Sequence, residues 1–170
     1  EKKANAAMFK GEQYFAQDSF ALALNGNGAD YLGFEAIIDD YSGTDAANLS
    51  KAYAGIRYFK MGDSQKALDL LKSYDGSDKM IAPSVTGLIG DCLVNAGKVE
   101  EGISYFEKAA SQADNEVVSP VYLKKAGLAY ESLKQNEDAV KAYTTIKEKY
   151  FNSLEATDIY KYSVRASSAK

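Results

Sequence analysis

The fold is decided by residues 89–106, which read IGDCLVNAGKVEEGISYF. Apolar side chains recur at helical spacing on both sides of the stretch Asn95-Ala96-Gly97-Lys98, which predicts two helices joined by a tight turn. Glycine can adopt the left-handed conformation that ends a helix, so the turn is assigned to Gly97. Small residues at Gly90 and Gly102 would let the two helices approach each other closely.

The same spacing recurs four times along the 170 residues. A glycine, here called a crossing glycine, is followed 12 residues later by another small residue, and a Tyr or Leu comes three residues after it. The last three units also have a bulky residue 16 positions after the glycine. The crossing glycines are Gly11, Gly55, Gly90 and Gly127, followed by Tyr14, Tyr58, Leu93 and Tyr130, by Ala23, Ala67, Gly102 and Ala139, and by Leu71, Phe106 and Tyr143. A fixed spacing over four units indicates a helical repeat array, with the bulky residues filling space between units.

Prolines and turn residues suggest where the helices begin and end. Pro83 and Pro120 each precede a crossing glycine by seven residues and are expected to be the first residues of helices, where a missing N–H costs nothing. Ser119 is the expected N-cap of the second of these helices. Lys134 stands where the two preceding units have a turn glycine, which predicts a less sharply defined hairpin.

The first unit and the C-terminus depart from the regular pattern. Residues 24–30, LNGNGAD, interrupt the second helix of the first unit before residues 31–38 resume one. In two places a Tyr is followed by Ser or Thr three residues later and by Ala after three more, which predicts Thr44 and Ser153 as N-caps. Ser153 would open a C-terminal helix that covers the last apolar face of the array.

The composition argues against most catalytic chemistry. The chain has no histidine and a single cysteine, so the commonest general base and metal ligand are missing and no intrachain disulfide can form. No nucleophile, base and orienting group can be named together, so we expect no catalytic residues and no cofactor. Cys92 lies in an apolar-periodic segment, which predicts a buried, unreactive thiol.

Two other binding chemistries are disfavoured by position and charge. Residues 25–30 offer side-chain oxygens, as calcium requires, but an EF-hand counted from the first of them would place Ala29 at position five and Ala36 at position twelve, where Glu is needed. Lys and Arg number 20 against 24 Asp and Glu, and there is no strongly basic run. We therefore expect no metal site and no nucleic-acid partner.

The spacing of these residues resembles the tetratricopeptide repeat family. Its pattern is met at Gly55, Tyr58, Ala67 and Leu71 and again 72 residues later, and the crossing glycines are 44, 35 and 37 residues apart, compared with about 34 in the family. The resemblance implies an all-α, right-handed solenoid of about four helix pairs plus a C-terminal capping helix, in one domain. The expected units are residues 4–43, 44–80, 81–117 and 118–151, and the expected capping helix comprises residues 153–168.

In this family the first helices of the pairs line a concave groove that holds a polypeptide. Carried onto this chain position by position, the resemblance implies a mixed, fairly apolar groove suited to a helix or an extended hydrophobic segment of a partner. The groove residues would be Met8, Glu12, Phe15, Ile56, Phe59, Lys60, Asp91, Val94, Asn95, Lys124, Leu128 and Glu131, with Ala16, Ala52 and Ser132 beside them. Ala52 and Ile56 replace the polar residues that chaperone-binding members use to clamp a carboxylate, so that clamp is expected to be absent. An alternative is that the protein's own capping helix covers part of this groove.

A finer resemblance concerns residues 32–49 and 54–55, which are similar to membrane-anchored bacterial envelope tetratricopeptide proteins. Some of these associate with the Sec translocon and periplasmic chaperones. The resemblance implies a non-catalytic adaptor in protein translocation or assembly, held at the periplasmic face by an N-terminal membrane helix upstream of residue 1. Three alternatives stay open: a cytoplasmic location, a self-associating structural module, and a small-ligand or sugar-binding protein that uses tyrosines such as Tyr160.

Overall fold

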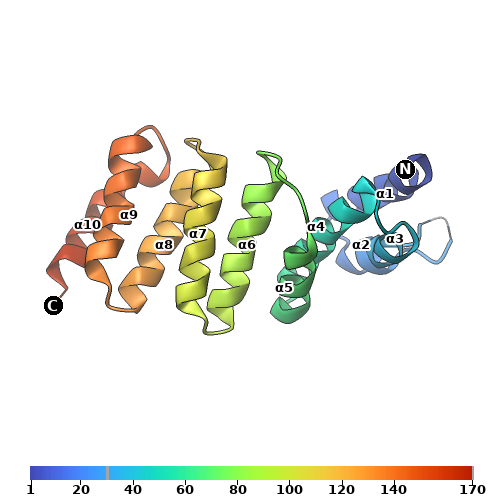
Figure 1. Ribbon diagram of the computed structural model, residues 1–170, viewed down its shortest axis with the longest axis horizontal. Helices are drawn as coiled ribbons and strands as arrows, with labels where there is room; N and C mark the ends of the chain where they lie inside the picture. Colours follow the sequence, from blue (N-terminus) through green and yellow to red (C-terminus); the bar gives the residue numbers. More distant parts are fainter. Residues whose placement is uncertain (30, 170) are drawn as a thin grey trace. The chain divides into compact units, whose positions relative to one another are not determined.

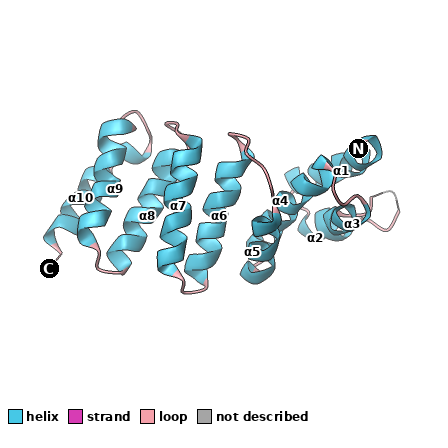
Figure 2. Ribbon diagram, in the orientation of Figure 1, coloured by secondary structure: helices cyan, strands magenta, loops and turns pink. Residues whose placement is uncertain are grey.

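The computed structural model describes residues 1–29 and 31–169. All regular structure among them is helical (Figures 1 and 2). The helices form two compact units, Glu1–Ser77 and Asp78–Lys170. The expectation of a single domain over residues 1–170 stays a prediction.

The N-terminal unit begins with an irregular helix pair. Its helices are α1 (Lys2–Ala16), α2 (Phe20–Asn25), α3 (Phe34–Asp40), α4 (Asp45–Lys60) and α5 (Ser64–Ser73). The predicted interruption of the second helix is present, because α2 ends at Asn25. However, α3 begins at Phe34 and not at Tyr31, since the Tyr31 hydroxyl donates a hydrogen bond to the Ala23 carbonyl at 2.6 Å and its side chain turns inward.

Aromatic side chains fill the core of this first pair. A Cβ on Gly11 would overlap the rings of Tyr31 and Phe34, so this glycine receives an aromatic residue of the inserted loop. The Phe34 ring stacks on Tyr53 of α4, with centroids 5.3 Å apart. Tyr14 lies 5.5 Å from Tyr31 and accepts a hydrogen bond from the Asn27 side chain at 3.1 Å. The inserted loop is thus part of the core of the unit.

The C-terminal unit is a regular array of antiparallel helices (Figure 1). Each helix packs on the next in chain order. The elements are α6 (Ile81–Asn95), α7 (Val99–Ala113), α8 (Ser119–Ser132), α9 (Asn136–Lys149), the 3-10 turn η1 (Glu155–Thr157) and α10 (Ile159–Ser168). The expected capping helix over residues 153–168 is therefore two elements, because Asp158 has a φ of −121° and separates η1 from α10.

The crossing glycines allow the close helix contacts that the sequence predicts. A Cβ on Gly55 would lie 2.6 Å from Leu71 Cγ, and one on Gly90 would lie 2.7 Å from the Phe106 ring. A Cβ on Gly127 would overlap Tyr143 in the same way. Each bulky residue therefore packs against the glycine of its own helix pair.

The bulky residues also reach the following helix, as expected. Phe106 stacks on Tyr122 of α8 with centroids 6.4 Å apart, and Tyr143 lies 5.8 Å from Tyr162 of α10. One side chain thus joins three helices, so packing within a pair and packing between pairs depend on the same residue.

All four hairpins have the same turn. Gly62 and Gly97 have φ values of 89° and 79°, as the sequence predicts. Asp18 and Lys134 adopt the same left-handed conformation without being glycine, with φ values of 54° and 59°. The hairpin at Lys134 makes the same two backbone hydrogen bonds as the hairpin at Gly97. The expectation of a less defined turn at Lys134 is wrong, because these hydrogen bonds fix the turn despite the cost of a side chain there.

The helix starts confirm some predicted caps and correct others. Thr44 accepts a hydrogen bond from the Ala47 N–H, and Ser153 accepts one from the Ala156 N–H. Ser119 is instead the first residue of α8, and its buried hydroxyl donates to the Ala110 carbonyl at 2.7 Å. Asn115 caps the turn before α8, because its side-chain oxygen accepts hydrogen bonds from the N–H groups of Val117 and Val118.

The two prolines lie within the first turn of their helices and are not the first residues. Pro83 is the third residue of α6, and Pro120 is the second residue of α8. Asp78, 37 residues before Asn115, caps the turn before α6 by accepting from the N–H groups of Met80 and Ile81. Both helices therefore begin after an equivalent capped turn.

We expect Lys134→Gly to raise the free energy of unfolding by about 1 kcal/mol, because glycine tolerates the left-handed conformation without steric cost. Gly97→Ala is the matched variant and should lower it by a similar amount, since no atom lies within 4 Å of the added Cβ and only backbone strain changes. Urea unfolding followed by circular dichroism measures both effects. A lower stability for Lys134→Gly would contradict this account of the turn.

Candidate functional site

A cleft of about 290 Å³ opens between α6 and α8 in the C-terminal unit and is here called the α6–α8 cleft. Its apolar lining consists of Val94, Phe106, Leu128 and Ala129, and its polar lining consists of Asp91, Lys125 and Ser132. Phe106 of α7 and Ala129 are buried, whereas Leu128 is 42% exposed. The cleft thus offers an apolar surface with a few polar groups around it, which is the usual composition of a binding site.

The crossing glycines determine which side chains line this cleft. Gly90 and Gly127 face the second helix of their own pairs. Successive residues are about 100° apart around a helix, so Asp91 and Leu128, each one residue later, lie on a different side. Val94, four residues after Gly90, is rotated about 40° from it toward the side of Asp91. The repeat spacing therefore brings these three residues to the same cleft.

An ion pair joins the two sides of the cleft. The Lys125 ammonium donates to both carboxylate oxygens of Asp91, at 2.8 and 2.6 Å. The same ammonium lies 5.7 Å from the ring centroids of Phe106 and Tyr122. Burial and the nearby Asp91 charge raise the pKa of Tyr122, so its hydroxyl stays protonated at neutral pH. The sequence did not point to Lys125, although its position two residues before Gly127 places it beside the predicted surface.

The structure brings together part of the predicted groove in this unit. Asp91, Val94, Leu128 and Ser132 line the cleft, and Asn95 is exposed at the end of α6. Lys124 and Glu131 instead contact the C-terminal segment.

The C-terminal segment is held by ionic hydrogen bonds. Lys124 donates to Asp158 at 3.0 Å and lies 4.5 Å from the Tyr162 ring centroid. Glu131 accepts two hydrogen bonds from Arg165, both at 2.9 Å, and one from the Tyr143 hydroxyl at 2.6 Å. The alternative that the capping helix covers part of the groove is correct for Lys124 and Glu131.

Part of the predicted groove of the N-terminal unit is closed by its own side chains. Met8 and Ala52 are buried, so these two residues cannot contact a partner as expected. The Arg57 guanidinium lies 3.5 Å from the centroid of the Phe15 ring, which is also edge-on to Tyr53 at 4.7 Å. Phe15 is therefore engaged within the unit.

Four other predicted residues of the N-terminal unit keep some exposure. Glu12, Ile56 and Phe59 are half-buried, and Lys60 is exposed, as is Ala16 beside them. Glu12 accepts a hydrogen bond from the Tyr53 hydroxyl at 3.4 Å. The binding role of this set stays a prediction.

Arg57 is the most informative residue that the sequence prediction missed. Its side chain is 1% exposed, and it donates hydrogen bonds to the Asp18 carboxylate at 3.0 Å and to the Phe15 carbonyl. The Arg57 hydrogen bond and the Lys60 charge lower the pKa of Asp18. The position two residues after the crossing glycine is occupied by Cys92 and Ala129 in later units. The other units named here have small, buried side chains at this position, so a cation there is the signal that could have revealed this contact.

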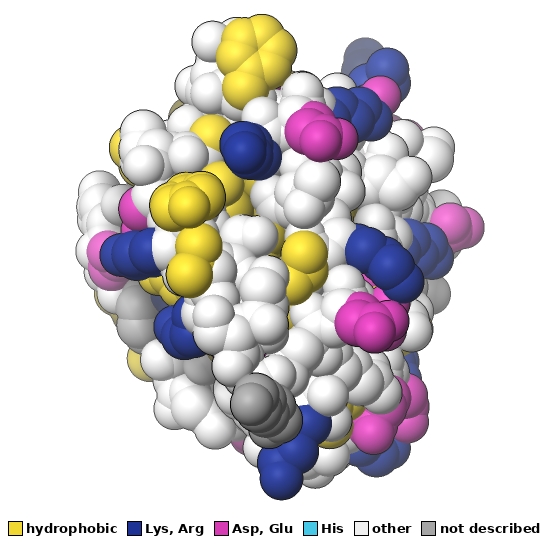
Figure 3. All heavy atoms as spheres, turned by 90° about the vertical axis from the view of Figure 1, so that its left-hand side faces the viewer, with side chains coloured by type: hydrophobic (Ala, Val, Ile, Leu, Met, Phe, Trp, Pro, Cys, Tyr) yellow, Lys and Arg dark blue, Asp and Glu magenta, His cyan; other side chains and the backbone are white. Residues whose placement is uncertain are grey.

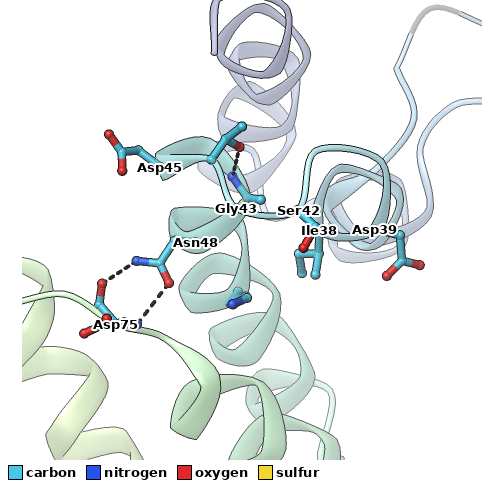
Figure 4. Close-up of a pocket in the computed structure, with 10 residues that line it drawn as sticks. Ile38, Asp39, Ser42, Gly43, Asp45, Asn48 and Asp75 are labelled. Carbon is cyan, nitrogen blue, oxygen red and sulfur yellow. Dashed lines mark hydrogen bonds between the residues drawn. The ribbon is translucent and has the colours of Figure 1, made fainter.

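A more polar pocket of about 520 Å³ lies in the N-terminal unit between α3, α4 and the segment after α5 (Figure 4). Asn48 pairs with the backbone of Asp75 through hydrogen bonds of 2.5 and 2.9 Å. Figure 4 shows this pair bridging α4 and the segment beyond α5, with Asp39 and Asp45 on other sides of the pocket. Within residues 1–29 and 31–169, no three acidic or thiol side chains are grouped to hold a metal ion.

Cys92 agrees with the sequence prediction of a buried thiol. Burial and the neighbouring Asp91 carboxylate raise its pKa to about 11. The thiol is therefore protonated at neutral pH and is a poor nucleophile. Among the helices of the described residues, none is both long enough and apolar enough to cross a membrane.

Comparison with known sequence families concerns the two helix pairs of the C-terminal unit. Models of the tetratricopeptide repeat match residues 87–115, in α6 and α7, and residues 122–153, in α8 and α9. These two segments match the tetratricopeptide repeat in sequence. The α6–α8 cleft therefore lies between the first helices of the two helix pairs that match the repeat, where the family resemblance led us to expect the groove.

Solved structures share the fold at low sequence identity. The crystal structure of MamA protein matches with a TM-score of 0.68 and 16% identity, over 96% of this chain and 91% of that chain. Kinesin light chain tetratricopeptide-like repeats from Podosopora anserina match with a TM-score of 0.68 and 13% identity, over 96% and 85%. The predicted fold class, an all-α tetratricopeptide-like solenoid, is confirmed. Curated protein sequences gave no significant match.

Acid should loosen the contact between the C-terminal segment and α8. Burial raises the pKa of Glu131, but hydrogen bonds from Arg165 and Tyr143 outweigh it and bring the pKa below 4.5. Hydrogen bonds from Lys124 and Lys161 lower the pKa of Asp158 below 3.8. Because both folded-state values are depressed, the stabilisation is complete above these ordinary values and is lost as the pH falls through the lower folded-state values.

Amide hydrogen exchange of α10, corrected for intrinsic rates, measures this effect between about pH 6 and pH 3. We expect the protection of α10 to fall with acid, while the protection of α6 changes less. The double variant Glu131→Gln, Asp158→Asn should lose most of the acid dependence. An equal acid response in the double variant would show that other groups hold α10.

Proposed function

We propose that the protein is a non-catalytic interaction scaffold and that the α6–α8 cleft binds apolar side chains of another polypeptide. The observation that carries this proposal is the exposed Leu128 beside Val94 and Phe106, in a cleft between consecutive tetratricopeptide repeats. Removing this apolar surface from water would favour binding by about 25 cal/mol per Å².

The size of the cleft supports a polypeptide partner over a cofactor. Sites for small molecules have volumes of about 300–1,000 Å³ and enclose most of their ligand. The α6–α8 cleft lies at the lower limit of this range, at about 290 Å³. A helix or extended segment that inserts one or two aliphatic side chains fits such a cleft.

The polar residues of the cleft would orient this partner. Asp91 and Lys125 satisfy each other, so an apolar side chain can enter beside them without leaving a single buried charge. Ser132 donates to the Ala129 carbonyl at 2.6 Å, and its oxygen can still accept a hydrogen bond from a partner.

We further propose that this scaffold acts as an envelope adaptor, displayed at the periplasmic face by a membrane helix encoded upstream of residue 1. Support comes from the resemblance of residues 32–49 to membrane-anchored envelope tetratricopeptide proteins. A translocon or periplasmic chaperone component would then be the partner. Protease treatment of spheroplasts tests the location: degradation of the domain without lysis is expected, and protection until lysis would favour the cytoplasmic alternative.

Binding in the cleft is tested with helical peptides selected from a displayed random library on the wild-type protein. We expect Leu128→Asp to weaken these peptides at least tenfold, because about 1.4 kcal/mol of binding free energy corresponds to a factor of ten. Leu22→Asp is the matched control, since Leu22 is 39% exposed and lies in the other unit. Fluorescence anisotropy measures the affinities, and circular dichroism checks that both variants remain helical. Equal binding to Leu128→Asp and wild type would place the binding surface elsewhere.

A further inference from the structure

Three exposed apolar residues recur at one spacing in the C-terminal unit. Met80, Val117 and Leu154 are 84%, 76% and 81% exposed, and each follows the previous one by 37 residues. Single exposed apolar residues are common on protein surfaces. Here, however, the exposed apolar side chains occupy the same position in every second loop of the unit. Exposed apolar surface that is grouped in this way marks interaction sites.

The three loops lie at the same end of the helices. In Figure 1 the segments that precede α6, α8 and α10 are all at the upper edge of the C-terminal unit. Figure 3 views the end formed by α9 and α10, and a hydrophobic side chain projects there at the same upper edge. Phe151, 66% exposed, belongs to the last of the three loops. Residues 78–81, 114–118 and 149–155 are here called the loop edge.

Side-chain caps hold the exposed residues in place. Asp78 accepts a hydrogen bond from the Met80 N–H at 2.9 Å, and Asn115 accepts one from the Val117 N–H at 2.9 Å. In the third loop, Ser153 donates to the Tyr150 carbonyl at 2.7 Å. A surface held in this way loses little conformational freedom on binding.

Asp114 connects the loops to one another. Its carboxylate accepts hydrogen bonds from Lys149 at 2.7 Å and from the Tyr150 hydroxyl at 3.0 Å. These contacts, together with the charge of Lys79, lower the pKa of Asp114. One carboxylate of the middle loop thus joins that loop to the last loop through two hydrogen bonds.

The charge of the loop edge selects the kind of partner. It contains the cations Lys79 and Lys149, both attracted to Asp114, and the further carboxylates Asp78, Glu116 and Glu155. The side chains of Glu116 and Glu155 are half-buried. An excess of carboxylates beside apolar residues disfavours an anionic membrane and favours a cationic partner.

We infer that the loop edge of the C-terminal unit docks a cationic amphipathic helix of another protein, separately from the α6–α8 cleft. The apolar face of that helix covers Met80, Val117 and Leu154, and its Lys or Arg side chains pair with Glu116 and Glu155. Packed helices lie about 8–10 Å apart, so three loops span on the order of 20 Å. A helix of about 13 residues covers this length at 1.5 Å per residue.

The probe is a fluorescein-labelled 14-residue peptide with Leu and Lys at helical period, and its fluorescence anisotropy measures binding to the 170-residue chain. We expect the triple variant Met80→Ser, Val117→Ser, Leu154→Ser to bind at least tenfold more weakly than wild type. Glu116→Gln with Glu155→Gln should weaken binding about threefold and reduce its salt dependence. A peptide with Glu in place of Lys should not bind.

The matched control is the triple variant Phe9→Ser, Leu32→Ser, Met61→Ser, which removes side chains that are 60%, 51% and 52% exposed in the other unit. This variant and Leu128→Asp should both bind the peptide as wild type does, which separates this inference from the cleft. If the peptide binds the loop-edge triple variant as tightly as wild type, its binding is a non-specific attraction between a cationic peptide and an acidic protein. That result would overturn the inference. Binding to phosphatidylcholine vesicles, lost in that variant, without binding to the peptide would also overturn it in favour of a lipid surface.

Discussion

The contact on which the structure depends is the close approach of two helices at a crossing glycine. At Gly55, Gly90 and Gly127 the space of a Cβ is taken by a bulky side chain from the second helix of the pair. Phe106 and Tyr143 then continue to the next helix. Because one side chain fills both contacts, the position of each helix pair fixes the position of the next within the C-terminal unit. The packing within a helix pair and the packing of one pair on the next thus depend on the same side chains.

This constraint also decides which residues remain available for binding. Once Gly90 and Gly127 face the second helices, the residues one position later are turned toward the other side, and Asp91 and Leu128 meet at the cleft. The same geometry in the N-terminal unit gives a different result, because Arg57 extends over Phe15 and reaches Asp18. The position of a residue in the repeat therefore specifies where its side chain lies. The chemical type of that side chain decides whether the surface there is accessible to a partner.

The sequence predicts the repeated helix pairs and their turns, and it is less accurate for exact helix starts and for residues that occur in one unit only. Equal spacing was sufficient for the helix pairs, the turns at Gly62 and Gly97 and the caps at Thr44 and Ser153. The start of α3 was wrong because Tyr31 occurs once and packs against Gly11 in place of a regular residue. In the site, Leu128 was predicted from the family resemblance, whereas the ion pair of Asp91 with Lys125 depends on which side chains meet across two helices. Such pairs leave no periodic pattern to detect.

The period that builds the core also copies surface features from one repeat to the next. Asp78 and Asn115 cap equivalent turns, and each presents an exposed apolar residue two positions later. A partner that contacts one such loop meets the next at a high effective concentration, so weak contacts at equal spacing add to useful affinity. This holds only if the spacing is fixed, and the side chains that pack at the crossing glycines and continue to the next helix fix it. The rigid packing that begins at the crossing glycines is therefore also what lets a row of small loops act as one surface.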